Sequence, residues 1–137
     1  MSESNKSVVL PTFTGNDEDF QTWWTKFLAF ATAKGVVEAL LGKEANLPAQ
    51  NSTPLDESND AEKLQIKARN RNNLAMAYLM TAFQSDADLS LTYEAMDDDW
   101  PGGLAYKVVE QLKEIYQPKD SITEVELYDK LMKVRMN

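Results

Sequence analysis

Apolar residues recur at intervals of three and four positions along most of the chain, the spacing that places them on one face of an α-helix. The first such segment is expected to be capped by Asn16 or Asp17 and to end at Gly35, because these residue types suit helix termini. Its apolar positions are Phe20, Trp23, Trp24, Phe27, Leu28 and Ala31. The pattern predicts a strongly aromatic helix near the N-terminus.

The same spacing predicts further helices in the rest of the chain. Their expected ranges are 36–41, 61–84, 88–96, 101–117 and 121–137. The longest has the apolar stripe Leu64, Ala68, Leu74, Ala75, Tyr78, Leu79, Ala82 and Phe83. Pro101 suits a first helical turn, and Ser121 with Glu124 fits a capping box. No segment alternates with a period of two, so we predict an all-α fold, a compact bundle of five or six helices.

Two segments lack this periodicity. Residues 1–12 are polar and then extended, because Pro11 keeps Leu10 out of the helical region. Residues 42–60 hold two prolines and many small polar side chains, which is typical of a long, mobile surface loop. We therefore expect an extended N-terminal arm at 1–12 and one helical domain over 13–137. Its last helix has no stop signal, and we expect the domain to be truncated from a longer polypeptide.

The composition excludes several kinds of chemistry. The 137 residues include no cysteine and no histidine, which removes disulfides, zinc knuckles, thiolate nucleophiles and histidine general bases. No catalytic motif or phosphate-binding loop stands out, so we expect no enzyme activity, no metal and no cofactor. The N-terminus does not read as a secretory signal, and no apolar run approaches the ~20 residues of a membrane span. A cytoplasmic protein without membrane contact is expected.

Charged residues offer two further candidate sites. Lys67, Arg69 and Arg71 form a basic patch that could touch RNA or a partner. The net charge of −8 opposes nucleic acid, so a solvated face or a contact with an acidic neighbour is the better interpretation. The acidic run Asp97–Asp99 could ligate calcium but lacks the spacing of an EF-hand loop. A solvated acidic turn is favoured there.

The adjacent Trp23 and Trp24 could stack on nucleic-acid bases, as aromatic platforms do in single-strand binders. Such platforms need interleaved basic residues, and the only nearby cation is Lys26. Adjacent helical residues also point about 100° apart. We therefore expect Trp23 in the core and Trp24 at its edge, covering a neighbouring helix.

Two runs of residues carry a family resemblance. The first is Phe13-x-Gly15 followed by Asp19-Phe20-x-x-Trp23-x-x-x-Phe27. The second is Ala105-x-x-x-Val109-x-x-Leu112-x-x-x-Tyr116, followed by Leu127-x-x-x-Leu131. In this order, the runs resemble the Gag polyproteins of copia-type LTR retrotransposons over nearly the whole chain. One departure is Val109, where a tryptophan is usual in that family.

The resemblance implies the N-terminal lobe of a capsid protein that self-assembles into virus-like shells around the RNA of the element. The partners it implies are other copies of the chain and a downstream Gag lobe, with RNA bound only indirectly through a downstream region. The core residues it implies are Phe13, Gly15, Phe20, Trp23, Phe27, Leu112, Tyr116, Leu127 and Leu131. Two alternatives stay open: a Gag-derived adaptor taken over by a host, and an unrelated helical protein-interaction module.

Overall fold

The computed structural model describes residues 9–117. Its elements are the short 3-10 helix η1 (Asp17–Asp19) and the α-helices α2 (Phe20–Lys34), α3 (Val37–Leu40), α4 (Asp60–Ala82), α5 (Asp86–Glu94) and α6 (Ala105–Tyr116). Within this range no strand occurs, only an isolated bridge between Phe13 and Phe83. The all-α prediction is therefore confirmed. The helix predicted from Ser121 lies outside the described residues.

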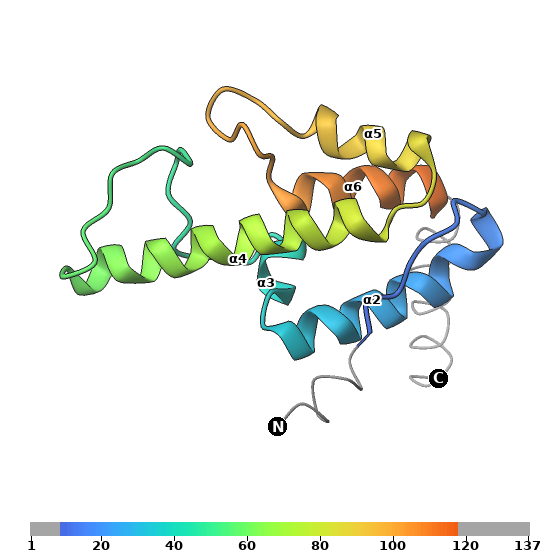
Figure 1. Ribbon diagram of the computed structural model, residues 1–137, viewed down its shortest axis with the longest axis horizontal. Coiled ribbons are helices and arrows are strands. Elements are labelled where there is room, and N and C mark those ends of the chain that lie inside the picture. The colour runs from blue at the N-terminus through green and yellow to red at the C-terminus, as the bar shows by residue number, and fades with distance from the viewer. Residues whose placement is uncertain (1–8, 118–137) are drawn as a thin grey trace, which may run out of the picture.

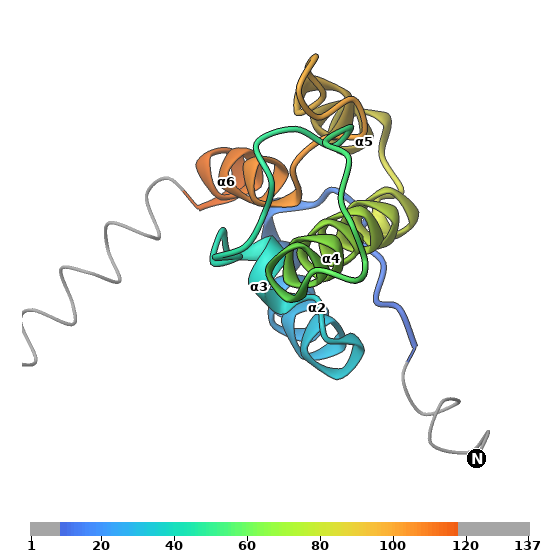
Figure 2. The same cartoon turned by 90° about the vertical axis from the view of Figure 1, so that its left-hand side faces the viewer.

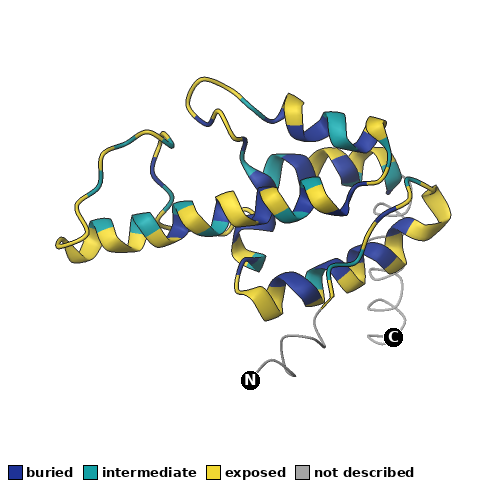
Figure 3. Ribbon diagram, in the orientation of Figure 1, coloured by how far each residue is buried: buried dark blue, intermediate teal, exposed yellow. Residues whose placement is uncertain are grey.

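The long helix α4 lies between the other helices. Figure 1 shows α5 on one side of α4 and α2 on the other, and the end-on view in Figure 2 shows α6 beside α4. Buried positions concentrate where these helices face one another (Figure 3). Of the helices within residues 9–117, none has both the length and the apolar character needed to cross a membrane.

Helix α2 ends as expected and begins differently. Gly35 has a φ of +76°, and its N–H donates to the last carbonyls of the helix, which is a glycine C-cap. The expected side-chain cap by Asn16 or Asp17 is wrong, because the chain enters through η1 with no side-chain cap bond there. Instead, the Thr14 hydroxyl donates to Asp19 and accepts from the Asn16 backbone N–H.

Helix α4 buries most of the predicted stripe, including Ala68, Ala75, Leu79 and Ala82, but two of its positions are exceptions. Leu64 and Leu74 are 50% and 42% exposed, whereas Asn72 and Met76 are buried. For Leu64 the reason is visible in Figure 1, where the first half of α4 projects beyond the other helices and meets only the preceding loop. An apolar position there has no helix to pack against. The Asn59 side chain caps this projecting end by accepting from the Glu62 N–H at 3.0 Å.

The predicted polar loop at 42–60 is present between α3 and α4. The interpretation of Pro101 is wrong, because this residue lies in a turn and α6 begins only at Ala105. The turn is closed by the Gly103 N–H, which donates to the Trp100 carbonyl at 2.8 Å. Helix α6 therefore follows a second loop, residues 96–104.

Candidate functional site

The residues of the family resemblance converge in one aromatic cluster at the α2 end of the bundle. Phe13, which precedes α2, stacks on Trp23 with ring centroids 5.1 Å apart. Tyr116, at the end of α6, stacks on Phe20 at 5.1 Å and meets Phe13 edge-on at 5.0 Å. These are the offset and edge-to-face geometries that aromatic pairs prefer. Phe27 continues the cluster along α2, 4.9 Å from Trp23.

Burial matches this arrangement for the described members of the set. The fully or almost fully buried ones are Phe13, Phe20, Trp23, Phe27 and Leu112. Tyr116 is half-buried, with its hydroxyl turned toward polar groups. Leu127 and Leu131 lie outside the described residues. Residues from the two ends of the described chain thus form one packing unit.

The expectation that Trp24 lies at the edge of the core is wrong. Trp24 is 5% exposed, against 4% for Trp23. Its ring is parallel to that of Phe20 at 6.4 Å, and the ammonium of Lys113 on α6 lies 5.3 Å from its centroid. An ammonium over a tryptophan ring is an attractive contact. Because α2 is covered from more than one direction, two side chains 100° apart are both buried.

A buried carboxylate connects three segments beside the aromatic cluster. Asp88 on α5 is 1% exposed and accepts from the Tyr116 hydroxyl at 2.5 Å and from the Ser85 hydroxyl at 2.8 Å. Gly15 approaches the same group with a φ of +97°, and a side chain there would come within 3.3 Å of the Asp88 carboxylate. This contact gives a physical reason for glycine at this position of the first run.

Tyr116 predicts an alkaline limit to stability. Burial, with the hydrogen bond to Asp88 and its charge, raises the pKa of the Tyr116 phenol above its usual 10.0. The folded state therefore keeps a proton that the unfolded state loses above pH 10, so this stabilisation is complete below that pH and lost above it. We expect the free energy of unfolding to fall more steeply above pH 10 in the wild type than in Tyr116→Phe, measured by urea denaturation.

The matched control is Tyr93→Phe, because Tyr93 is 60% exposed. This variant should keep the alkaline slope of the wild type. Parallel slopes for the wild type and Tyr116→Phe would contradict the assignment.

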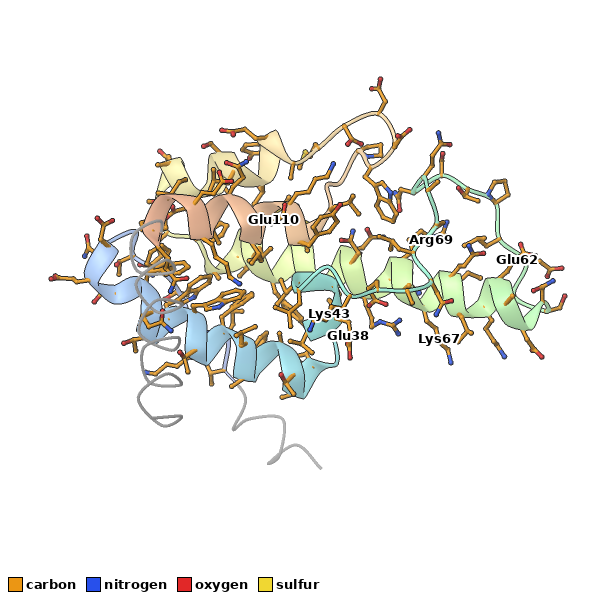
Figure 4. All side chains as sticks on the ribbon, turned by 180° about the vertical axis from the view of Figure 1, so that it is seen from behind. Glu38, Lys43, Glu62, Lys67, Arg69 and Glu110 are labelled. Carbon is orange, nitrogen blue, oxygen red and sulfur yellow. The ribbon has the colours of Figure 1, made fainter. Side chains whose placement is uncertain are left out.

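The basic patch is not a continuous surface. Arg69 donates to the carbonyls of Asn51 and Thr53, both at 2.9 Å. Arg71 forms a two-point ion pair with Glu44, with distances of 2.5 and 2.7 Å, and these bonds raise the pKa of the guanidinium. Figure 4 shows Arg69 on the side of α4 that the loop covers and Lys67 on the opposite side. The preferred interpretation, contact with an acidic neighbour, holds for Arg71.

The acidic turn Asp97–Asp99 contacts the same loop between α3 and α4 that Arg69 and Arg71 contact. The Asp97 carboxylate accepts from the Trp100 N–H at 2.7 Å, which lowers the pKa of Asp97 below its usual value. Asp99 accepts from the Gln50 side chain at 3.0 Å, and its carbonyl accepts from the Asn51 N–H at 2.8 Å. Within residues 9–117 no group of three acidic side chains could hold a metal ion. The contacts of Asp99 fasten the second loop, residues 96–104, to the loop between α3 and α4.

Two further side chains hold the second loop in place, Trp100 against the first loop and Asn72 against α4, and sequence reasoning missed both. Trp100 is 3% exposed, and its indole N–H donates to the Ala49 carbonyl at 3.2 Å. Asn72, 1% exposed, donates to the Gly103 carbonyl at 3.0 Å and accepts from the Ala105 N–H at 2.9 Å. It thereby satisfies a free backbone donor at the start of α6. The loop between α3 and α4 is thus anchored at its centre, which argues against the mobility expected from its composition.

Arg69→Ala should loosen the loop at 43–59. Two hydrogen bonds from a charged group are lost, so we expect the free energy of unfolding to fall by about 1–3 kcal/mol. Proteolysis within the loop should also become faster. The control is Lys67→Ala, an exposed position two residues away that should change stability by no more than about 0.5 kcal/mol. Equal effects of the two variants would contradict the anchoring role of Arg69.

Two hollows lie beside the groups described above. Beneath the first loop, a cavity of about 50 Å³ is lined by residues that include Glu44, Asn72 and Tyr106, and this space suits water molecules. A shallow groove of about 350 Å³ runs between Pro11 and Trp23, with Asp19 and Lys26 at its margin. The Asp19 carboxylate already accepts from Thr14.

Comparisons with protein-family models, curated protein sequences and solved structures found no match to this chain. Its function is therefore inferred from its own residues and their contacts.

Proposed function

We propose that this chain is a structural protein, the N-terminal lobe of a Gag capsid protein of a copia-type LTR retrotransposon. It self-assembles, together with a downstream lobe, into virus-like shells that enclose RNA. The observation that carries the proposal is the aromatic cluster. The two runs that resemble the family supply opposite sides of one contact, with Phe13 and Phe20 from the first meeting Tyr116 from the second. The spacing of both runs is therefore explained by one packing contact between them.

The use of the charged side chains also favours a structural role over catalysis. Sequence reasoning considered Arg69, Arg71 and Asp97 as binding groups. In the structure Arg69 bonds to loop carbonyls, Arg71 to the Glu44 carboxylate and Asp97 to the backbone of its own turn. Groups held in this way shape and stiffen a surface. A stiff helical body with braced loops suits a protein that meets neighbouring copies in a fixed orientation.

RNA is expected to reach such a shell through another region of the protein. The net charge of −8 repels phosphate. Two of the three cations of the basic patch are engaged inside the fold. This chain accordingly supplies protein contacts, and the RNA-binding part belongs to the downstream region.

The test of this proposal is self-association. Shells are built from many repeated weak contacts, so residues 1–137 alone should be monomeric or weakly associating at micromolar concentration. They should oligomerise further when crowded or fused to the downstream lobe. Light scattering over a concentration series measures the first expectation, and electron microscopy of the full-length product measures the second.

Other outcomes favour the alternatives. A tight dimer at nanomolar concentration would support an interaction module or a domesticated adaptor. A full-length product that forms no particles, with or without RNA, would contradict the capsid proposal. Micromolar RNA binding by this chain at physiological salt would contradict the expectation that RNA is bound only through a downstream region.

A further inference from the structure

Negative charge is concentrated in the last third of the described chain. Residues 84–117, which hold α5, the second loop and α6, contain eight of the 22 acidic residues and two of the 14 basic ones. Eight minus two gives a local charge of −6, within a chain whose total is −8. The remaining residues are therefore close to neutral overall. Most of the net negative charge therefore lies in residues 84–117.

The solvent-exposed side of α5 and α6 has a groove and exposed apolar groups. We call it the outer α5–α6 face, consisting of Tyr93, Glu94, Glu110, Gln111, Glu114 and Ile115. A groove of about 250 Å³ lies between Glu94 at the end of α5 and Glu110 on α6. Tyr93 and Ile115 are 60% and 50% exposed.

The carboxylates of this groove are free to meet an external cation. Lys107 also lines it, but its ammonium lies 3.6 Å from the Asp97 carboxylate. Within residues 9–117, neither Glu94 nor Glu110 forms an ion pair. A basic group from another molecule would therefore meet two carboxylates without a competing partner in this part of the chain.

A complementary surface lies on the other side of the same molecule. We call it the lysine edge, consisting of the exposed Lys43, Lys63 and Lys67. Lys63 and Lys67 are one turn apart on α4 and share a face. The ion pair between Glu44 and Arg71 holds residue 43 beside the next turn of α4. Figure 4 shows Lys43 and Lys67 along the lower side of the molecule, with Glu38 among them, and Glu110 on α6 above.

We propose that the outer α5–α6 face of one copy of this chain binds the lysine edge of a second copy. The inference rests on the proposed self-assembly and names the surfaces that perform it. The two surfaces differ, so the contact is heterologous and each copy keeps one free surface of each kind. It therefore extends to a third copy, which a ring or a shell requires. Opposite charges steer the encounter, and salt weakens the contact.

A charge-swap experiment tests the pairing. One variant carries Glu94→Lys with Glu110→Lys, and the other carries Lys43→Glu with Lys67→Glu. Each alone should associate at least about tenfold more weakly than the wild type, because like charges then face each other. An equimolar mixture should regain association, because each variant offers the charge that the other needs. Sedimentation velocity at low salt and high protein concentration gives the readout.

The control carries Asp17→Lys with Glu18→Lys, two exposed positions in η1 outside both surfaces. It has the same change in net charge as the first variant. Its association should therefore show only the effect of net charge, without the tenfold loss expected of the first variant. Circular dichroism verifies that every variant is folded. Because all substituted residues except those of the control lie on the two named surfaces, a general charge effect is separated from a specific one.

The outcomes separate this inference from the proposed function. If the wild type associates but the mixture does not regain association, or only one variant is impaired, the pairing is overturned while self-assembly stands. If the wild type stays monomeric at every concentration and salt, and fusion to the downstream lobe changes nothing, both proposals fail. Restoration in the mixture supports the pairing.

Discussion

Replacing Trp24 with alanine is expected to lower the free energy of unfolding by about 3–5 kcal/mol, as much as Trp23→Ala, because both remove a large buried aromatic side chain. The two rings are 5% and 4% exposed. Trp23 packs on Phe13 and Phe27, and its indole N–H donates to the Pro11 carbonyl at 3.0 Å. Trp24 packs on Phe20 and lies beneath Lys113.

Chemical denaturation of both variants measures this effect. Thr22→Ala is the control, because Thr22 precedes the pair on α2 and is exposed. It should change stability by about 0.5 kcal/mol or less. A Trp24→Ala variant that loses clearly less than Trp23→Ala would mean that Trp24 lies at the edge of the core, as its position in the sequence first indicated.

Asn72→Ala is expected to lower the free energy of unfolding by about 2–6 kcal/mol, although it removes only a small polar side chain. Two buried backbone groups lose their partner, the Gly103 carbonyl and the Ala105 N–H. Each unsatisfied group costs about 1–3 kcal/mol. The loss acts at the start of α6 and in the second loop, so it should loosen both.

Chemical denaturation measures the loss of stability, and amide hydrogen exchange shows which part of the chain is loosened. The Ala105 amide should exchange faster in the variant than in the wild type, beyond the change that global destabilisation explains. Asn70→Ala, an exposed position on the same helix, is the control and should leave that amide unchanged. An Asn72→Ala protein with unaltered exchange at Ala105 would rule out the capping role.

Local patterns predicted the helices well, because helix formation responds to apolar spacing and to residues at the ends. The stop at Gly35 and the all-α class follow from such nearby signals. The aromatic side of the candidate site was also predictable in part, since Phe20, Trp23 and Phe27 share one helical face. Their partner Tyr116 lies on the predicted face of another helix, although spacing alone does not say that the two faces meet.

Only the tertiary structure decided which side of each helix is covered by another segment. Leu64 fits an apolar stripe yet is exposed, because the first half of α4 projects from the bundle. Asn72 looks like a solvent-facing residue but is buried, because its partners lie 31 and 33 positions further along the chain. Arg69 and Arg71 likewise bond to a loop that precedes them by 16 to 27 positions. A sequence pattern records the period of a helix, whereas burial and pairing depend on which distant segments come to lie against it.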